Sequence, residues 1–371
     1  SLFDFEELAK KLMMSHRYYY YDYKAGQGHT YQACRNYFDK QLRILPRILI
    51  DVTNISLKTT IFGCTYESPI IIAPTAFHCL AHIDGEVETA RGATAAKCIY
   101  TYNWVYSTMP EEKVLQATGP KFFHIYLTVS NDILETIVPQ VDKKGYRAIV
   151  VTCDDPTTRT RDNILPLFLE ASKHIDPTIF QTVETANISV NNFCSDPTFN
   201  KMAITWTNLE RLRKLTRLSI ICKGILSPAD AELAIKYGAN GIIVSNHGSR
   251  VIDTTASAIE CLKDIINVVD GRAEGKVCLI TISSMFLILK NLQEVFVDTA
   301  IRTGTDVLKA LALGARAVFI GRPILYGLCC GGQNGVRRVL DILKKELTYD
   351  MACCGLTSID QINEDILYKY A

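Results

Sequence analysis

The sequence Gly241-Ile242-Ile243-Val244-Ser245-Asn246-His247-Gly248-Ser249-Arg250 places a short apolar run directly before a histidine and an arginine. The apolar part has the composition of a buried parallel strand. His247 can accept a proton near neutral pH, and Arg250 carries a fixed charge whose planar fork matches a carboxylate. At the C-terminal end of one strand, the pair predicts a site that binds an acid and removes a proton from it. For His247 alone, a structural histidine at a capped strand end is the alternative interpretation.

Other apolar, β-rich runs share this form, each ending in small or polar residues. With the first, they are residues 69–76, 98–104, 121–127, 148–154, 218–224, 241–248, 294–300 and 317–323. Helix-like segments lie between most of them, at residues 85–97, 110–118, 132–144, 228–237, 257–269 and 305–313. Strands that alternate with helices predict an α/β protein with a parallel sheet, and eight such units close into a (β/α)8 TIM barrel. A doubly wound open sheet is the alternative, but no G-x-G-x-x-G motif follows an early strand.

We expect a single domain over residues 1–371. Its parts are an N-terminal helical cap over residues 1–68 with short strands at 48–62, the barrel over residues 69–345, and C-terminal helices over residues 346–371. The connection over residues 155–217, after the fourth strand, is far longer than an ordinary loop and predicts a lid. Residues 275–293 are interpreted as an insertion on the N-terminal side of the barrel, although residues 276–282 could themselves be the seventh strand.

The composition is that of a globular protein without a nucleic-acid or membrane partner. The 371 residues carry a formal net charge of +1, which gives no attraction to phosphate backbones or anionic lipids. The 13 cysteines are scattered and lack zinc spacing, so we expect no metal site and reduced thiols in an intracellular compartment. No signal peptide opens the chain, and the longest apolar stretch is too short to span a bilayer.

The expected strand ends carry most of the reactive side chains. In chain order they are Pro74-Thr75-Ala76, Trp104, Tyr126, Asp154, Lys223, His247 with Arg250, Asp298 with Arg302, and Gly321-Arg322. Because the C-terminal ends of all strands in such a barrel meet on one face, these groups are expected to converge on one site. Taken singly, each is better explained by the need of a strand end to meet water.

The segment Ser245-Asn246-His247-Gly248-x-Arg250 closely resembles the active-site signature of the FMN-dependent 2-hydroxy acid oxidases and dehydrogenases, the glycolate oxidase family. Residues 307–315 and 319–323 resemble that family's phosphate-side segments, and residues 46–52 and 73–76 are also similar to it. The resemblance extends from about Phe5 to about Ile362, and residues 74–78 and 223–226 are most similar to the animal hydroxyacid oxidases. It implies FMN as the cofactor and a small 2-hydroxy acid as the substrate.

The resemblance also implies a role for each residue of the predicted site. His247 would be the base, Asp154 would orient it, and Lys223 would stabilise the reduced flavin, with Tyr126 bonded to the substrate. The substrate-binding residues implied are Tyr23, Arg161, Arg250 and Trp104, with the two arginines as a carboxylate clamp. The cofactor-binding residues implied are Pro74, Thr75, Ala76, Tyr102, His124, Thr152, Lys223, Ser245, Asp298, Arg302, Gly321 and Arg322, of which Arg302, Gly321 and Arg322 would hold the phosphate.

The sequence departs from the family's pattern around the expected flavin site. The family's Asp-Gly-Gly is here Asp298-Thr299-Ala300, and glycine allows a positive φ that a β-branched threonine tolerates poorly. Tyr102 replaces a serine that faces the flavin, and His124 replaces a glutamine that contacts it. Asp155 replaces a threonine and adds a negative charge beside an anionic substrate. These changes predict weakened FMN binding.

The expected activity is the FMN-dependent oxidation of (S)-2-hydroxy acids to 2-oxo acids, with oxygen as the acceptor and hydrogen peroxide as the second product. The alternative is a degenerate barrel with weak or lost FMN binding and no oxidase activity. An FMN-dependent isomerase is disfavoured by the arginine clamp. The family implies a homo-oligomer, a tetramer or octamer, in the peroxisome. The chain ends Lys369-Tyr370-Ala371, which is not a peroxisomal tripeptide, so the expectation is otherwise cytoplasmic.

Overall fold

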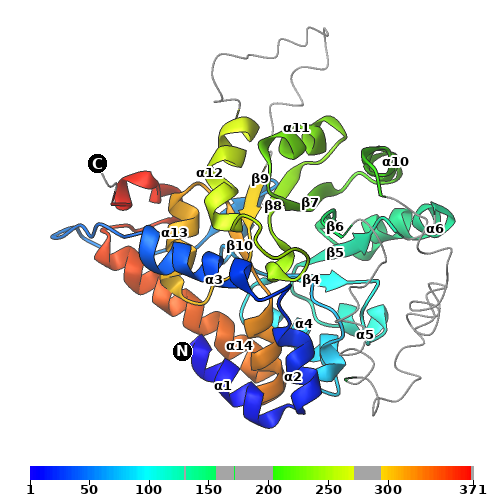
Figure 1. Cartoon of the computed structure of the whole chain (residues 1–371), viewed down its shortest axis with the longest axis horizontal. Helices are drawn as coiled ribbons and strands as arrows, with labels where there is room; N and C mark the ends of the chain where they lie inside the picture. Colours follow the sequence, from blue (N-terminus) through cyan, green and yellow to red (C-terminus); the bar gives the residue numbers. More distant parts are fainter. Residues whose placement is uncertain (129–130, 156–170, 172–203, 271–293, 369–371) are drawn as a thin grey trace, which may run out of the picture.

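The computed structural model describes residues 1–128, 131–155, 171, 204–270 and 294–368. Its centre is a closed barrel of parallel strands in the order β10-β3-β4-β5-β6-β7-β8-β9 (Figure 1). The strands are β3 (Ile70–Ile72), β4 (Ile99–Asn103), β5 (Lys121–Tyr126), β6 (Ala148–Thr152), β7 (Ser219–Ile225), β8 (Gly241–Val244), β9 (Glu294–Val297) and β10 (Ala317–Ile320). Each of the eight apolar runs contributes one strand, so the predicted barrel is confirmed. The seventh position is occupied by β9, and residues 276–282 lie outside the described residues.

Helices cover the outside of the barrel. They are α1 (Leu2–Leu12), α2 (Ser15–Asp22), α3 (His29–Asn36), α4 (Gly85–Ala95), α5 (Glu111–Leu115), α6 (Asn131–Val141), α10 (Trp206–Leu215), α11 (Pro228–Lys236), α12 (Ala258–Val269), α13 (Gly304–Ala312) and α14 (Arg322–Cys353). Shorter helical turns are η1 (Tyr37–Gln41), η2 (His78–Leu80), η3 (Asp142–Lys144), η6 (His247–Ser249), η7 (Ile359–Gln361) and η8 (Glu364–Ile366). Every helix-like segment of the sequence contains a helix. In the described part of the chain, each helix is too short or too polar to cross a membrane.

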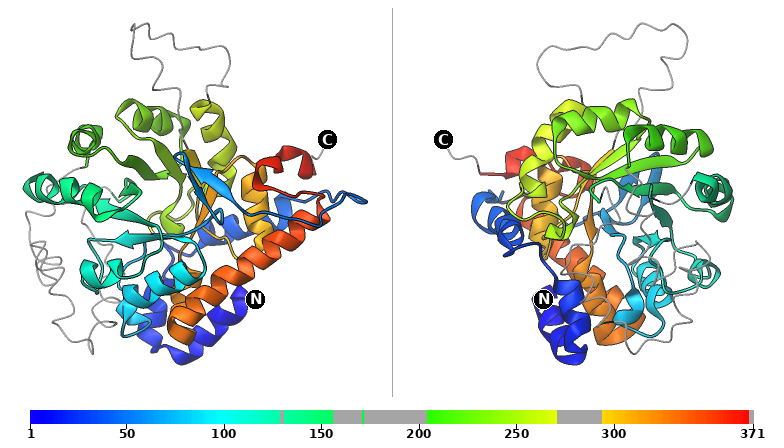
Figure 2. Two further views of the ribbon diagram at one scale, coloured as in Figure 1. Left: turned by 180° about the vertical axis from the view of Figure 1, so that it is seen from behind. Right: turned by 45° about the vertical axis from the view of Figure 1, so that its right-hand side comes forward.

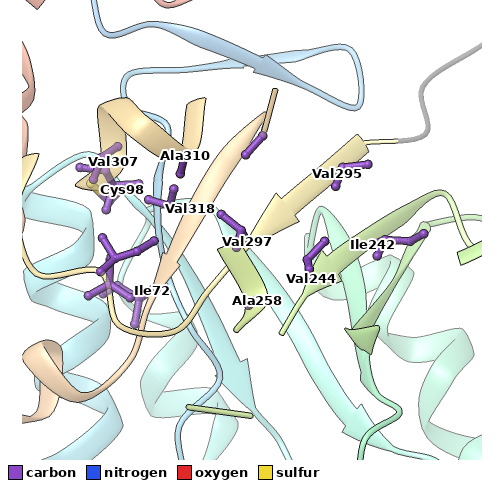
Figure 3. Close-up of a cluster of buried hydrophobic side chains, with 14 of the residues drawn as sticks. Ile72, Cys98, Ile242, Val244, Ala258, Val295, Val297, Val307, Ala310 and Val318 are labelled. Carbon is purple, nitrogen blue, oxygen red and sulfur yellow. The ribbon is translucent and has the colours of Figure 1, made fainter. Parts of the chain in front are cut away.

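Each barrel strand is buried on both faces, because successive side chains alternate between the interior and the helix layer. Ile71, Ile99, Phe122 and Phe296 belong to the interior cluster. The opposite faces form an outer cluster in which Ile72, Val244 and Val297 from strands meet Val307 and Ala310 from α13 (Figure 3). This double burial explains why the strands appear in the sequence as continuous apolar runs rather than alternating ones.

A two-stranded hairpin closes the N-terminal end of the barrel. The strands β1 (Thr59–Ile61) and β2 (Cys64–Tyr66) pair antiparallel and lie across this end, as Figure 2 shows from behind. Ile61 is fully buried in the interior cluster, and the ring of Phe62 lies 6.1 Å from that of Phe296. The apolar plug leaves the opposite, C-terminal end for polar chemistry. Of the short strands predicted at 48–62, the structure has only β1.

The N-terminal helices reach from the side of the barrel to its C-terminal rim. α1 packs along α14, and α2 follows it (Figures 1 and 2). α14 bends at Gly331–Gly332, where both residues leave the helical conformation, and it runs unbroken through the predicted boundary between residues 345 and 346. That boundary is therefore wrong, because the last barrel helix and the expected C-terminal helix are one element. Most of the predicted lid at 155–217 and all of 275–293 lie outside the described residues.

Candidate active site

A histidine and a carboxylate meet at the C-terminal rim. His247 lies in the turn η6 after β8, and its Nδ1 is 2.8 Å from Oδ1 of Asp154, which follows β6. Because the carboxylate accepts the Nδ1 proton, the Nε2 atom of His247 is left as the proton acceptor. Burial alone would raise the pKa of Asp154, but His247 and Lys223 outweigh it and hold that pKa below its ordinary value. Gly224, at φ +106°, is required beside the pair, because a Cβ there would overlap the Asp154 carboxyl group.

Lys223 supplies a buried positive charge next to this pair. Its Nζ donates to Oγ of Ser245 at 3.2 Å and forms an ion pair with Oδ2 of Asp298 at 3.5 Å. Burial alone would lower the pKa of Lys223, but the carboxylates of Asp298 and Asp154 raise it above its ordinary value. Lys223 therefore remains a cation at neutral pH, held by residues that follow β6, β8 and β9.

Two arginines at the rim cap the C-terminal end of α2, whose last carbonyl groups have no partner within the helix. Arg250 donates from Nη1 to the carbonyl oxygens of Tyr20 at 3.0 Å, Tyr21 at 2.9 Å and Tyr23 at 3.4 Å. Arg322 donates from Nε to the carbonyl oxygen of Tyr21, from Nη1 to that of Gly248, and from Nη2 to that of Tyr23, at 2.8 to 3.0 Å. The predicted phosphate role of Arg322 stays a prediction, because each of its guanidinium nitrogens donates to a backbone carbonyl here.

Arg302 is placed differently and has donors to spare. It is 4% exposed, and its Nε and Nη2 atoms are buried without a hydrogen-bond partner, although Glu6 approaches Nε to 4.0 Å. Its backbone amide donates to Asp306 at 2.8 Å, at the start of α13. Arg35 of α3 donates to the same Asp306 carboxylate and to the Ala300 carbonyl oxygen. Unpaired buried donors on a fixed cation match a bound anion such as a phosphate.

Polar groups from the middle of the barrel face the same rim. His124 bonds through Nε2 to Thr152 Oγ1 at 2.7 Å, and its Nδ1 is buried without a partner. Burial, with Lys223 and His247 adding to it, holds the pKa of His124 well below its ordinary value, so the ring is neutral. The Oγ1 atom of Thr101 is also buried and unpartnered. These orphaned atoms would suit the polar edge of a bound ring.

The residues that follow β3 and β10 lie side by side. Pro74-Thr75-Ala76 is half-buried, and a Cβ at Gly321 would lie 3.6 Å from Thr75 Cγ2. Thr75 Oγ1 bonds to Nε2 of the buried His78 at 2.6 Å, and the amide of His78 donates to the buried carboxylate of Glu86. Sequence reasoning missed this support of Thr75 by His78 and Glu86. The PTAFH motif that contains His78 was the available signal.

The structure corrects Tyr102 on β4 and gives Trp104, which follows this strand, an aromatic neighbour. Tyr102 was expected to face the flavin, but its ring belongs to the outer cluster and its hydroxyl donates to the Met109 carbonyl oxygen at 3.2 Å. Trp104 was expected to contact the substrate. Its half-buried ring packs beside Phe123 of the same outer cluster, at 6.2 Å, and its substrate role stays a prediction. For Tyr102 the reason is strand alternation, since Ile99 points inward and residues of even number on this strand point outward. Thr101 was missed, and the same alternation would have identified it.

The remaining predicted residues are placed as follows. Tyr126 is buried, at the rim, with its ring 5.2 Å from that of Tyr106. Its pKa is raised well above the ordinary value, by burial and then by Tyr106 and Asp155, so the phenol stays protonated. The hydroxyl of Tyr23 is buried without a partner. Burial, and then Asp154, raises the pKa of Asp155. The raised pKa favours the protonated carboxyl group, which carries no negative charge. Arg161 lies outside the described residues.

The loop after β9 keeps the backbone that glycine would adopt, although it has none. Thr299 has φ 74° and Ala300 has φ 65°, both in the left-handed region. Non-glycine residues pay roughly 1–2 kcal/mol each for this conformation. Two consecutive non-glycine residues in this conformation therefore make the loop after β9 a strained segment of the rim.

Together these observations define a barrel enzyme whose rim carries a carboxylate–histidine pair, a buried lysine and an anion-binding arginine. The sequence profile described as FMN-dependent dehydrogenase matches residues 9–369, and the chain belongs to this family. It is 37% identical over 371 residues to 2-hydroxyacid oxidase 2 of Rattus norvegicus, covering 99% of this chain and 97% of the relative. A peroxisomal (S)-2-hydroxyacid oxidase of Arabidopsis thaliana is 34% identical, covering 98% and 94%.

Solved structures of other proteins are similar to this chain in both sequence and fold. A mandelate oxidase is 30% identical, with a TM-score of 0.79 and coverage of 99% and 98%. A flavocytochrome b2 variant with pyruvate bound is 29% identical, with a TM-score of 0.82 and coverage of 99% and 86%. The family uses FMN, and the residues present fit that group. Arg302 offers unpaired donors to a phosphate, and the buried, unpartnered Nδ1 of His124 and Oγ1 of Thr101 are polar atoms that a bound ring could satisfy.

Proposed function

We propose that this protein oxidises (S)-2-hydroxy acids to 2-oxo acids and passes the electrons to oxygen, giving hydrogen peroxide. The observation that carries the proposal is the His247–Asp154 pair beside the buried cation of Lys223, on the rim of an FMN-family barrel. The relatives named 2-hydroxyacid oxidase cover nearly the whole chain. The degenerate-barrel alternative gains no support from these comparisons.

The proton chemistry follows from the pair. His247 Nε2 takes the proton released as the substrate's alcohol carbon is oxidised, and Asp154 stabilises the resulting imidazolium through the 2.8 Å bond to Nδ1. The low pKa of Asp154 keeps its carboxylate charged for this task at neutral pH. FMN, when bound, supplies the two-electron redox chemistry that no side chain can provide. Lys223 and Arg302 are the buried cations that would hold its anionic parts.

The substrate carboxylate would meet the arginine and tyrosine groups at the end of α2. Arg250 is fixed there by its bonds to backbone carbonyls and by the rings of Tyr20 and Tyr23, 5.4 and 5.5 Å from its guanidinium carbon. The unpartnered hydroxyl of Tyr23 and the protonated phenol of Tyr126 are donors suited to a carboxylate and an alcohol oxygen. A neutral alcohol without a carboxylate would leave these groups unpaired, which selects for acids.

The deciding experiment is the visible spectrum of the purified protein, recorded without oxygen before and after adding an (S)-2-hydroxy acid. We expect a flavin band that bleaches, and one equivalent of hydrogen peroxide per 2-oxo acid once air is admitted. The (R)-enantiomer is the matched control and should leave the band intact. A flavin band that no 2-hydroxy acid bleaches would contradict the substrate class. A folded, colourless protein that takes up no added FMN would make the degenerate barrel correct.

The proposal includes a cellular location and an oligomeric state. Relatives from Arabidopsis thaliana are named peroxisomal oxidases, which supports a peroxisomal location for this protein. The family resemblance supports a homo-oligomer, a tetramer or an octamer. Cell fractionation of the full-length protein and light scattering during size exclusion would test the two proposals, and a monomer or an exclusively cytoplasmic protein would contradict them.

A further inference from the structure

The turn that carries His247 is bound by side chains at each of its backbone amides. The three residues of η6 (His247–Ser249) have φ values of 58°, 63° and 60°, and only the middle one is glycine. In order, their amides donate to Ser245 Oγ at 3.0 Å, Thr299 Oγ1 at 3.2 Å and Asn246 Oδ1 at 3.1 Å. Ser245 and Asn246 belong to the same loop, whereas Thr299 comes from the end of β9. Thr299 therefore ties the turn to a neighbouring strand.

The hydroxyl of Thr299 makes a second bond that fixes its role. It donates to Oδ1 of Asp298 at 2.8 Å while it accepts from the amide of Gly248. Neither direction can be reversed, because an amide only donates and a carboxylate only accepts. The other oxygen of Asp298 pairs with Lys223 at 3.5 Å. One hydroxyl thus connects the backbone next to His247 with the carboxylate that holds Lys223.

The backbone conformation of Thr299 indicates that this side chain does more than fill space. Its φ of 74° is one that β-branched residues rarely adopt, and the residue is 9% exposed. A strained conformation persists only where the surrounding structure holds it, and such residues cluster at functional sites. The two bonds of the hydroxyl are what the site gains from a threonine, since a glycine would adopt this φ without strain but has no side chain to make them.

We propose that Thr299 is a positioning residue that holds the His247 turn and the Asp298–Lys223 ion pair in register for the reaction. The proposal deepens the proposed function and rests on it. With the hydroxyl present, the Gly248 amide is fixed, so that His247 Nε2 keeps one position relative to the substrate. Without it, the half-buried Gly248 amide and an oxygen of the buried Asp298 carboxylate lose their partner, and the turn can shift.

The test compares Thr299→Val, Thr299→Ser and Thr299→Gly in the flavin-loaded protein. Valine keeps the shape and the β-branch without the hydroxyl, serine keeps the hydroxyl, and glycine removes both the hydroxyl and the strain. Thr94→Val is the matched control, because the Thr94 hydroxyl also bridges, donating to the Ala90 carbonyl oxygen and accepting from the Gly119 amide, at the opposite end of the barrel. Each variant is measured for kcat, KM, flavin content and thermal midpoint.

We expect Thr299→Val and Thr299→Gly to lower kcat about tenfold, with KM and flavin content within about twofold of wild type, and Thr299→Ser to retain at least about half of kcat. Thr94→Val should lower the thermal midpoint and leave kcat unchanged. Hydrogen exchange of the Gly248 amide is read in the same proteins and should be faster in the valine and glycine variants only. If the valine variant does not fold, the glycine variant decides.

Equal kcat in valine, serine and wild-type proteins would overturn the proposal, as would a serine variant that loses as much as valine. A loss confined to flavin content would make Thr299 a cofactor-site residue instead and would also overturn it. If wild type oxidises no 2-hydroxy acid, the proposed function fails, and the Gly248 exchange rates still decide whether Thr299 holds the turn.

Discussion

The two ends of the barrel are built in opposite ways. The N-terminal end is closed by the hairpin β1-β2, whose Ile61 and Phe62 pack into an apolar interior. The C-terminal rim holds charged groups, orphaned polar atoms and strained backbone. Five of the nine non-glycine residues with positive φ in the described part of the chain lie in the two loops that follow β8 and β9: His247, Ser249, Thr254, Thr299 and Ala300. The contrast indicates that one end supplies stability, which allows the other to carry strain for function.

The largest expected effect at the rim is from His247→Ala. Loss of a general base should lower kcat by about 10²- to 10⁴-fold, while FMN stays bound because the phosphate site is elsewhere. Stopped-flow reduction of the flavin without oxygen checks the effect directly. Reduction near the wild-type rate would show that another group takes the proton.

At the N-terminal end of the barrel, Ile61→Ala should lower the stability of the protein and leave catalysis unchanged. Truncating this fully buried side chain removes about 2–5 kcal/mol of unfolding free energy, measured by urea denaturation. The kcat of the folded fraction should match wild type. A parallel loss of kcat would mean that the two ends are coupled, and the contrast between them would not hold.

Arg302 and Arg322 lie at the same rim but differ in the partners of their guanidinium groups. Arg302→Met should weaken FMN binding by about 1.5–3 kcal/mol, since it removes charge-assisted bonds to the phosphate. Arg322→Met should weaken FMN binding less and should instead loosen α2, whose carbonyls it caps. Titration of the flavin-free protein with FMN separates them, with limited proteolysis after Arg17 as the second readout. Equal losses of FMN affinity would assign both arginines to the phosphate.

The Asp154 carboxylate should give the rim a pH-dependent stability. Its pKa is lowered in the folded protein, so its contribution is complete above the ordinary pKa of about 3.9 and is lost as pH falls through the lower folded value. The difference in unfolding free energy between wild type and Asp154→Asn, measured by urea denaturation, should therefore be constant from pH 5 to 7 and should shrink below about pH 4. A difference that grows with acidity would contradict the lowered pKa.

The smallest effect expected is a gain from Ala300→Gly. Glycine removes roughly 1–2 kcal/mol of left-handed strain at φ 65° from the folded state. It also stabilises the unfolded chain by about 0.4–1 kcal/mol, because glycine has more conformational freedom there. The net result should be a slightly higher thermal midpoint, with kcat unchanged. A fall in the midpoint would show that the Ala300 methyl group contributes more packing than its strain costs.

The fold was readable from the sequence because every barrel strand is buried on both faces and ends at a small or polar residue. Strand ends also located His247, Asp154 and Lys223, which the structure brings together. Tyr102 was misplaced because a position near a strand end does not give the face of the strand, which depends on counting from an inward residue such as Ile99. The partners of Arg250 and Arg322 were not predictable, since they are backbone carbonyl groups, which every residue has.

The capping of α2 has a consequence for how the protein is made. Tyr21 and Tyr23 leave the ribosome early, yet the arginines that bind their carbonyl groups follow 229 and 299 positions later. Strand β3 must likewise wait for β10 to close the barrel. The N-terminal helix can dock only after almost the entire chain has been synthesised, so the rim is completed among the last events of folding. Nascent chains stalled before Arg322 should therefore contain a site that cannot work, and turnover begins only when the barrel is whole.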